Sequence, residues 1–151
     1  MPSRPCPDPA CGIARSLDVL GERWALLIVR DAMLGRTRFS EFRSHLGVSP
    51  DILAARLASL VDFGVLTRET YREPGERERE EYLLTDAGRA LAPVLSALGS
   101  WGLEHRPVDA GSRITFTDPD SGAPVRLAFL APDGREVAPG ALRVTRSEQP
   151  A

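Results

Sequence analysis

The chain has 151 residues, of which 42% are hydrophobic and 26% charged, and its formal net charge is −2. This length predicts one domain with an appendage, and the composition is that of a globular protein rather than a fibrous or disordered one. No apolar run is long enough to span a bilayer and no signal peptide opens the chain, so we expect a cytoplasmic protein with no membrane partner. All nineteen basic residues are Arg. A nucleic-acid-binding protein with a negative net charge must gather its basic residues locally.

Two short helices are predicted after a Pro-rich, flexible arm over residues 1–10. The first helix ends at Gly21 and carries apolar residues at helical spacing, namely Ile13, Leu17 and Leu20. The second helix ends near Gly35, and one of its faces is formed by Trp24, Leu27, Ile28 and Asp31. We expect Trp24 to pack in the core rather than to stack on a ligand.

Residues 39–64 predict two helices joined by a tight turn. One face of the first helix carries Phe39, Phe42 and Leu46. Ser49 is suited to cap the second helix, Pro50 to open it and Gly64 to end it in a left-handed conformation. The apolar stripe of the second helix consists of Leu53, Leu57, Leu60 and Val61. This arrangement is typical of a helix-turn-helix motif, whose second helix enters the DNA major groove.

A β-hairpin is predicted directly after this motif. Residues 65–71 and 82–84 are rich in β-branched, aromatic and aliphatic side chains, and Pro74-Gly75 between them is a turn signal. Arg and Glu crowd the tip of the hairpin, at residues 72, 73 and 76–81. A hairpin in this position is the wing of a winged helix-turn-helix.

A further amphipathic helix is predicted from Thr85-Asp86 to about His105, with Pro93 marking either its true start or a kink. The wing already covers one side of a small core. Part of the apolar stripe of this helix is therefore expected to find no partner within the domain. Pairing with a second copy would bury that surface, since most homodimers are two-fold symmetric. The stripe consists of Leu91, Val94, Leu95, Leu98 and Trp101. The predicted dimer interface consists of Leu17, Leu91, Leu95, Leu98 and Trp101.

After Pro107, apolar residues alternate with polar ones at strand spacing, with turn signals between the alternating segments. The segments are Ile114/Phe116, Val125/Leu127/Phe129 and Leu142/Val144. We expect three or four short strands that lean on the main domain or on a partner chain, because so short a segment buries little core by itself.

The predicted fold is therefore mostly α with a small β-hairpin wing, a winged helix-turn-helix, plus a short β-rich C-terminal extension. Its parts are a flexible arm over residues 1–10, a DNA-binding and dimerisation domain over residues 11–106, and the extension over residues 107–151.

The segments from about Cys11 to His105 resemble the HxlR family of bacterial winged helix-turn-helix transcription regulators. The motifs that carry the resemblance are CGIARSLDVLGERWALLIVRDAMLG, RFSEF, GVSPDILAARLASLVDFGVL and EEYLLTDAGRALAPVLSALGSWG. The resemblance implies a homodimer paired through the first and last helices of the domain. It also implies that the second helix of the motif recognises DNA and that the wing contacts phosphate or the minor groove. The wing is longer and richer in Glu than is usual in the family, so Arg79, three residues before Tyr82, matches the family pattern better than Arg77.

The side of the predicted recognition helix opposite its leucines carries small and polar residues that suit a DNA groove. Arg56 can donate two hydrogen bonds to guanine, and Ala55 or Ile52 can contact a thymine methyl group. Asp51 can accept a hydrogen bond from cytosine, or it can simply favour the helix N-terminus. The alternative for the whole face is an ordinary solvated surface. The candidate residues of the motif are Ser49, Asp51, Ile52, Ala55, Arg56 and Ser59.

Arginines flank this helix in the sequence. Arg36 and Arg38 precede the motif and can clamp phosphate, while Arg77 and Arg79 on the wing can reach phosphate or a narrow minor groove. The alternative is a surface charge network, because Glu residues stand among the wing arginines. These Glu side chains should oppose binding to DNA in general, so we expect weak non-specific affinity.

Cys11 stands just before the first predicted helix, where the HxlR family often carries a cysteine. A thiol at a helix N-terminus has its thiolate form favoured, so Cys11 is a candidate sensor of oxidants or electrophiles. Cys6 is close in sequence and is a candidate resolving thiol. The equally weighted alternative is that Cys11 has no regulatory role.

The sequence shows no catalytic constellation, phosphate-binding loop or metal-ligand set, and no Cys or His follows His105, which excludes a zinc ribbon there. We expect neither an enzyme nor a cofactor. The predicted function is that of a homodimeric regulator, a repressor, that binds a pseudo-palindromic operator in double-stranded DNA. One variant of this prediction adds a small-molecule effector in an apolar pocket between the dimer helices and the wing domain. The rival prediction is a protein-interaction module that has lost DNA binding, which the net negative charge, the Glu-rich wing and the extension favour.

Overall fold

The computed structural model describes residues 11–75, 77–111 and 113–145. The predicted arm over residues 1–10, with Cys6, lies outside the described residues. The structure separates into two compact units, Met1–Leu95 and Ser96–Ala151, and each is described here by itself. This division falls inside the last long helix, and the domain boundary near residue 106 stays a prediction.

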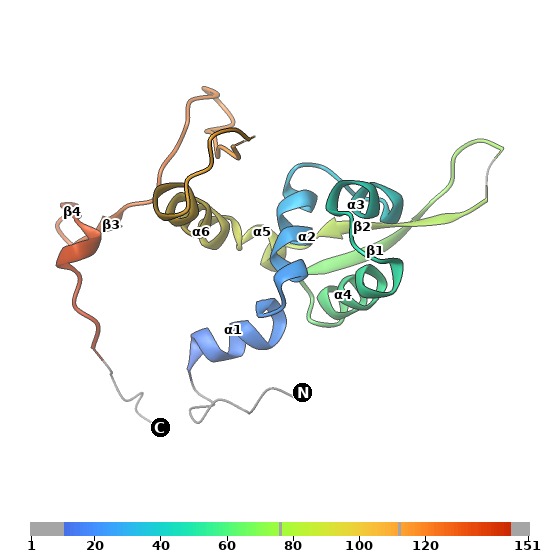
Figure 1. The fold of residues 1–151 in the computed structure, drawn as a ribbon, viewed down its shortest axis with the longest axis horizontal. Coiled ribbons are helices and arrows are strands. Elements are labelled where there is room, and N and C mark those ends of the chain that lie inside the picture. The colour runs from blue at the N-terminus through green and yellow to red at the C-terminus, as the bar shows by residue number, and fades with distance from the viewer. Residues whose placement is uncertain (1–10, 76, 112, 146–151) are drawn as a thin grey trace. The chain divides into compact units, whose positions relative to one another are not determined.

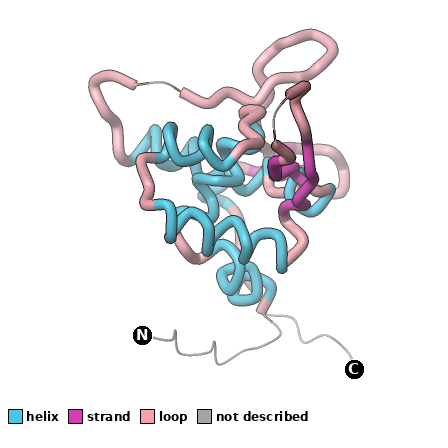
Figure 2. The backbone as a smooth tube through the Cα atoms, turned by 90° about the vertical axis from the view of Figure 1, so that its right-hand side faces the viewer, coloured by secondary structure: helices cyan, strands magenta, loops and turns pink. Residues whose placement is uncertain are grey.

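The first unit is a bundle of short helices with one antiparallel hairpin, as predicted for a winged helix-turn-helix (Figure 1). Strands form a small part of the chain beside the helices (Figure 2). The elements in order are α1 (Gly12–Leu20), α2 (Arg23–Met33), α3 (Phe39–Leu46), α4 (Pro50–Asp62), β1 (Leu66–Tyr71), β2 (Arg79–Leu84), α5 (Asp86–Arg89) and α6 (Ala92–His105), of which α6 continues into the second unit. No helix among the described residues is both long and apolar enough to cross a membrane.

The predicted turn between α3 and α4 forms because its residues suit the backbone there. Gly47 ends α3 in a left-handed conformation, with φ of 63°. Ser49 caps α4, and its hydroxyl accepts a hydrogen bond from the Ile52 backbone N–H at 3.4 Å, while Pro50 takes the first helical position. Gly64 follows the end of α4 with φ of 72°. The predicted boundaries of the recognition helix are confirmed.

The core of the first unit is built from the apolar faces predicted for α2, α3 and α4. Its largest fully buried apolar side chains are Ile28, Val29, Phe42, Leu53, Leu57, Leu60 and Leu66. Trp24 is half-buried and packs against this core, as predicted. Because the leucines of α4 point inward, the opposite side of α4 must face outward.

The hairpin pairs from Leu66↔Leu84 to Tyr71↔Arg79 and extends past α3 and α4 (Figure 1). The segment before α3 joins its edge, because the Tyr82 N–H donates to the Thr37 carbonyl at 2.7 Å and Arg38 bridges Glu81. The wing is therefore anchored to the start of the helix-turn-helix.

The single helix predicted after the wing is divided into α5 and α6. Thr85 caps α5, where its hydroxyl accepts the Gly88 backbone N–H at 3.1 Å. Pro93 has no N–H to donate to the carbonyl of residue 89, so a continuous helix would lose a hydrogen bond there. Pro93 lies in the first turn of α6 and marks the start of that helix, one of the two predicted outcomes.

The extension contains less sheet than predicted. Its described strands are β3 (Phe129–Leu130) and β4 (Glu136–Val137), which pair antiparallel, and Thr117 forms an isolated bridge with Pro124. A short 3₁₀ helix, η1 (Pro139–Ala141), follows. The prediction of three or four strands is wrong for the described residues, because alternating residues form a strand only beside a partner strand. None of the described residues from 107 to 145 is buried, which agrees with the expectation that this segment forms little core.

Candidate nucleic-acid interface

The outward side of α4 is open to solvent in the first unit. Asp51 and Ala55 are exposed, Ile52 is 43% exposed, and Arg56 and Ser59 are half-buried at the edges of this side. The buried leucines fix the rotation of α4 about its axis, so the described residues leave the predicted DNA-reading side chains exposed or only partly covered. The small side chains of Ala55 and Ser59 allow another surface to approach the α4 backbone closely.

Arg56 has a carboxylate near it in the same chain. Its Nη2 lies 4.0 Å from Oε1 of Glu22, the residue that precedes α2, and the Glu22 side chain is 64% exposed. An exposed ion pair at this distance contributes little to stability. Arg56 can therefore turn toward another hydrogen-bonding partner at small cost.

Arg38 is held more firmly, by two residues of the wing. Its Nη2 donates to Oε1 of Glu73 at 2.6 Å, and its guanidinium carbon lies 4.4 Å from the centroid of the Tyr71 ring. The hydrogen bond to Glu73 is the main cause that raises the pKa of Arg38 above its ordinary value. Arg38 thus links the start of α3 to the wing.

The backbone at the start of α3 is capped by Glu41. Its Oε2 accepts the N–H groups of Thr37 at 2.9 Å and Arg38 at 3.0 Å. These two hydrogen bonds, with that of Arg38 the larger, lower the pKa of the Glu41 carboxyl. Because these hydrogen bonds hold the backbone, the position from which the Arg38 side chain extends is fixed.

The other predicted phosphate contacts lie before α3 and along the wing. Arg36 is half-buried, and its backbone N–H donates to the Asp31 carbonyl at 3.1 Å. Arg77 is exposed in the tip of the wing, and Arg79 lies on β2 opposite Tyr71. The structure brings Arg38 together with the wing, while Arg77 lies farther out along it.

A buried charge network joins α2 to α3, and sequence reasoning missed it. Asp31 is fully buried; its Oδ1 accepts from Nε of Arg30 at 2.9 Å, and its Oδ2 lies 2.5 Å from Nδ1 of His45. The acidic residue on an apolar helix face was a visible signal, but the spacing of His45 in the sequence does not reveal the contact. Among the described residues, no group of three or more Asp, Glu, His or Cys side chains is arranged to hold a metal.

Cys11 occupies the N-cap position of α1 as a half-buried free thiol. Its side chain makes no capping hydrogen bond to α1. The predicted partner Cys6 lies outside the described residues.

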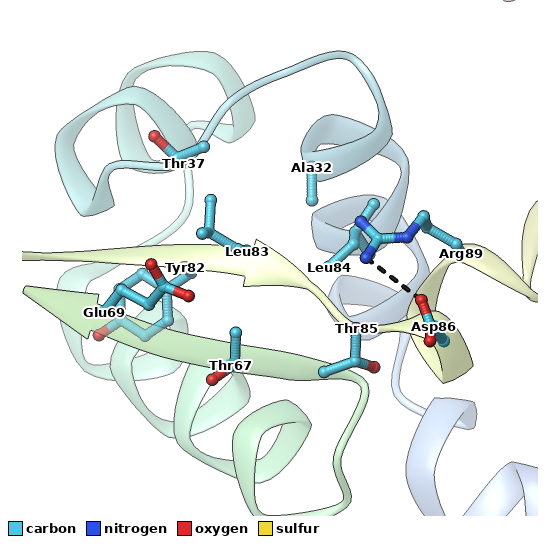
Figure 3. Close-up of a pocket in the computed structure, with 10 residues that line it drawn as sticks. All are labelled: Ala32, Thr37, Thr67, Glu69, Tyr82, Leu83, Leu84, Thr85, Asp86 and Arg89. Carbon is cyan, nitrogen blue, oxygen red and sulfur yellow. Dashed lines mark hydrogen bonds and ion pairs between the residues drawn. The ribbon is translucent and has the colours of Figure 1, made fainter.

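Open grooves mark the surface of the first unit, and two of them are lined by described residues. One, of about 520 Å³, runs along β1 and β2 toward α5 and carries both polar and apolar side chains. Arg89 lines it and pairs with Asp86, as Figure 3 shows. Nη2 of Arg89 lies 3.4 Å from Oδ1 of Asp86. The other, of about 510 Å³, lies among α1, the turn after α4, and α5, and includes Gly12 and Phe63. Neither groove is an enclosed cavity.

The predicted dimer residues divide into two groups by exposure. Leu17, Leu98 and Trp101 are 58%, 51% and 57% exposed. Leu91 and Leu95 are half-buried, because they pack against the core of the first unit.

Residues 19–110 match the family model described as HxlR-like helix-turn-helix. The chain belongs to this HxlR-like family of transcription regulators. Over 102 residues it is 40% identical to an uncharacterised HTH-type transcriptional regulator, MT3179 of Mycobacterium tuberculosis (strain CDC 1551 / Oshkosh). This match covers 68% of the chain and 63% of MT3179, so the chain spans less than two thirds of that relative. Members of the HxlR-like family are regulators and not enzymes.

Solved structures agree with this family. The crystal structure of PA1607, a transcription-factor candidate, is 43% identical, with a TM-score of 0.78 over 93% of this chain and 97% of that one. The redox regulator HypR in its reduced form is 30% identical, with a TM-score of 0.57 over 64% of this chain and 94% of that one. The match to PA1607 therefore includes much of the C-terminal extension, whereas the match to HypR covers a shorter part of the chain.

Proposed function

We propose that this HxlR-like chain is a homodimeric transcription regulator, a repressor, that reads double-stranded DNA with the outward side of α4. The observation that carries the proposal is that this side is uncovered while its leucines are buried. A recognition helix needs this arrangement, because its base-reading side chains must be free while its other side holds it rigid. The family membership supports the same function.

The proposed contacts follow from the chemistry of each side chain. Arg56 reads guanine, and the small or apolar residues Ala55 and Ile52 contact thymine methyl groups. Ser49, Asp51 and Ser59 add polar contacts along the same side. The flanking arginines bind phosphate and set the register of α4 without reading sequence. They are Arg36, Arg38, Arg77 and Arg79.

The proposed dimer binds a pseudo-palindromic operator. Two recognition helices related by a two-fold axis meet major grooves about one helical turn apart, on the order of 34 Å. The proposed interface uses apolar residues of α1 and α6, of which Leu17, Leu98 and Trp101 are exposed and Leu91 and Leu95 are half-buried. We propose residues 11–106 as the DNA-binding and dimerisation domain, residues 107–151 as its extension, and the bacterial cytoplasm as the place of action.

The experiment that tests this function measures fluorescence anisotropy of a labelled DNA duplex from the region upstream of the gene, against a duplex of scrambled sequence. We expect tighter binding to the upstream duplex and an affinity that falls steeply as the salt concentration rises, because phosphate contacts release cations. Equal, salt-independent or absent binding to both duplexes would reject the proposal.

We also propose a thiol switch at Cys11. The support is its position at the start of α1, beside the proposed interface, and the description of the similar protein HypR as a redox regulator. Mild oxidant should change the operator affinity of the wild type and leave that of Cys11→Ser unchanged. An equal response of both proteins, or of neither, would reject the switch. A small-molecule effector in the groove beside α1 is a separate proposal, supported by the volume of about 510 Å³.

The second candidate function is a protein-interaction module that keeps the fold without binding DNA. It is favoured by the net charge of −2 and by the exposed apolar side chains of the extension, such as Leu127 and Phe129. In this case the anisotropy assay shows no binding, and a partner protein purifies with the chain.

A further inference from the structure

The wing carries its own anionic partner for an arginine of the proposed DNA-binding surface. Arg38 stands at the start of α3, and its backbone is fixed by Glu41 and by the bridge to Glu81. Its guanidinium is bound by the Glu73 carboxylate at 2.6 Å and lies over the Tyr71 ring at 4.4 Å. The sequence distance between Arg38 and Glu73 is 35 residues, so this contact exists only in the folded wing.

The Glu73 carboxylate is bound to the Arg38 guanidinium, which is the group that a DNA phosphate would otherwise bind. Carboxylate and phosphate oxygens accept the same charge-assisted hydrogen bonds from a guanidinium. The pair is at the surface, with side chains 40% and 47% exposed, so solvent screens it and a phosphate can displace it. Displacement leaves a free carboxylate next to the polyanion, which opposes binding.

We propose that Glu73 takes the place of a DNA phosphate on Arg38 and thereby weakens binding to DNA of any sequence. Phosphate contacts are the same for every sequence, so weakening one of them lowers non-specific affinity and increases the share of binding that α4 must supply. Tyr71 keeps the guanidinium in place for either anion. This inference rests on the proposed DNA-binding function and assigns a role to Glu73 within it.

The proposal has a consequence for salt dependence. When Arg38 binds a phosphate in the wild type, the phosphate releases a cation but the freed Glu73 carboxylate retains one. With Gln at position 73 the cation is released without this compensation, so the slope of log affinity against log salt should steepen by about one unit for each protomer bound. A fourfold rise in salt then removes about a three- to fourfold advantage per contact.

The test compares four proteins in anisotropy titrations with a mixed-sequence duplex and with the upstream duplex, over a series of salt concentrations. They are the wild type, Glu73→Gln, Arg38→Gln and the double variant. Glu78→Gln is the matched control, because Glu78 is an exposed carboxylate of the same wing for which the described residues include no ion pair with Arg38. Circular dichroism checks that each variant is folded.

We expect Glu73→Gln to bind the mixed-sequence duplex about three- to tenfold more tightly than Glu78→Gln at low salt, with the steeper slope. In the Arg38→Gln background, the effect of Glu73→Gln should shrink to that of Glu78→Gln, because the two residues act as a pair. If wild type binds DNA but Glu73→Gln and Glu78→Gln behave alike, or the gain persists without Arg38, the role of Glu73 is overturned while the proposed function stands. If no variant binds either duplex, the proposed function is overturned and the role of Glu73 with it.

Discussion

Asp31 places a carboxylate inside an apolar core, where a charge is costly unless it is paired. Arg30 and His45 supply the pairing, and His45 comes from the first helix of the motif. The network therefore holds α3 against α2. Because α3 leads into the turn before α4, the network also fixes where the recognition helix begins. The sequence showed an acidic residue on an apolar helix face, but a contact between side chains 14 residues apart depends on how the two helices cross.

We predict that Asp31→Ala lowers the free energy of unfolding by about 2 kcal/mol, the usual contribution of hydrogen bonds to a charged group. The loss is moderated because the side chains left behind, Arg30 and His45, are 28% and 43% exposed and can bind water. His45→Ala should cost about 1 kcal/mol, since Arg30 still pairs with the carboxylate. Urea denaturation measures both values; a larger effect of His45→Ala than of Asp31→Ala would contradict this account.

Gly88 is a residue whose identity the packing requires. A Cβ atom at this position would lie 2.2 Å from the Val65 carbonyl oxygen and 2.8 Å from a methyl carbon of Leu84. Gly99 in α6 is a matched control, because a Cβ there would meet nothing within 4 Å apart from its chain neighbours and the nearby backbone of its own helix.

We predict that Gly88→Ala lowers the free energy of unfolding by about 2 kcal/mol, because a backbone carbonyl must move to admit the methyl group. Gly99→Ala should raise it by about 0.5–1 kcal/mol, because alanine restricts the unfolded chain and suits a helix. If this is right, thermal and urea unfolding show a lower free energy of unfolding than the wild type for Gly88→Ala and a higher one for Gly99→Ala. Equal destabilisation by both would show that the close approach at Gly88 has no special role.

At the scale of elements, the sequence predicts the bounds of a helix best where the backbone preferences of single residues determine them. The bounds of α3 and α4 follow from Gly47, Ser49 and Pro50, whose backbone preferences act over a single turn. The extension shows the opposite case, because Ile114 and Val144 alternate with polar residues and yet form no strand. A strand depends on a partner that its own residues do not specify.

In the candidate site, too, one feature could be predicted from the sequence and another could not. The outward side of α4 was predictable, because three buried leucines fix the helical periodicity and hence the residues opposite them. The attachment of Arg38 to Glu73 and Tyr71 was not, because it depends on how the wing folds back toward α3. The sequence therefore predicted which side of the helix faces outward, and the structure added how a flanking arginine is held.

At the scale of the whole molecule, the net charge of −2 makes general attraction to DNA weak, so binding must come from a local arrangement. A dimer doubles that arrangement and gives it two-fold symmetry. Large apolar side chains remain exposed in the single chain, including Leu17 and Trp101. A second copy would remove such surface from water.

We predict that Leu98→Glu, at a side chain 51% exposed in α6, converts a dimer to a monomer, because the proposed interface cannot bury an unpaired carboxylate. Sedimentation velocity measures the mass. Val108→Glu, at a side chain 73% exposed just after α6, is the control and should leave the dimer intact. A wild type that sediments as a monomer, or a Leu98→Glu variant that remains a dimer, would reject this interface.

The central claim is that the outward side of α4 lies in the major groove, and guanine N7 protection from dimethyl sulfate tests it most directly because N7 is exposed only there. On a duplex that the protein retains from genomic DNA, we expect two protected patches about 10 base pairs apart. With Arg56→Gln, protection at one guanine in each patch should be lost, and the discrimination against other bases at that position should fall by about 1–3 kcal/mol. Binding without any N7 protection, or protection that Arg56→Gln leaves unchanged at every guanine, would contradict the account.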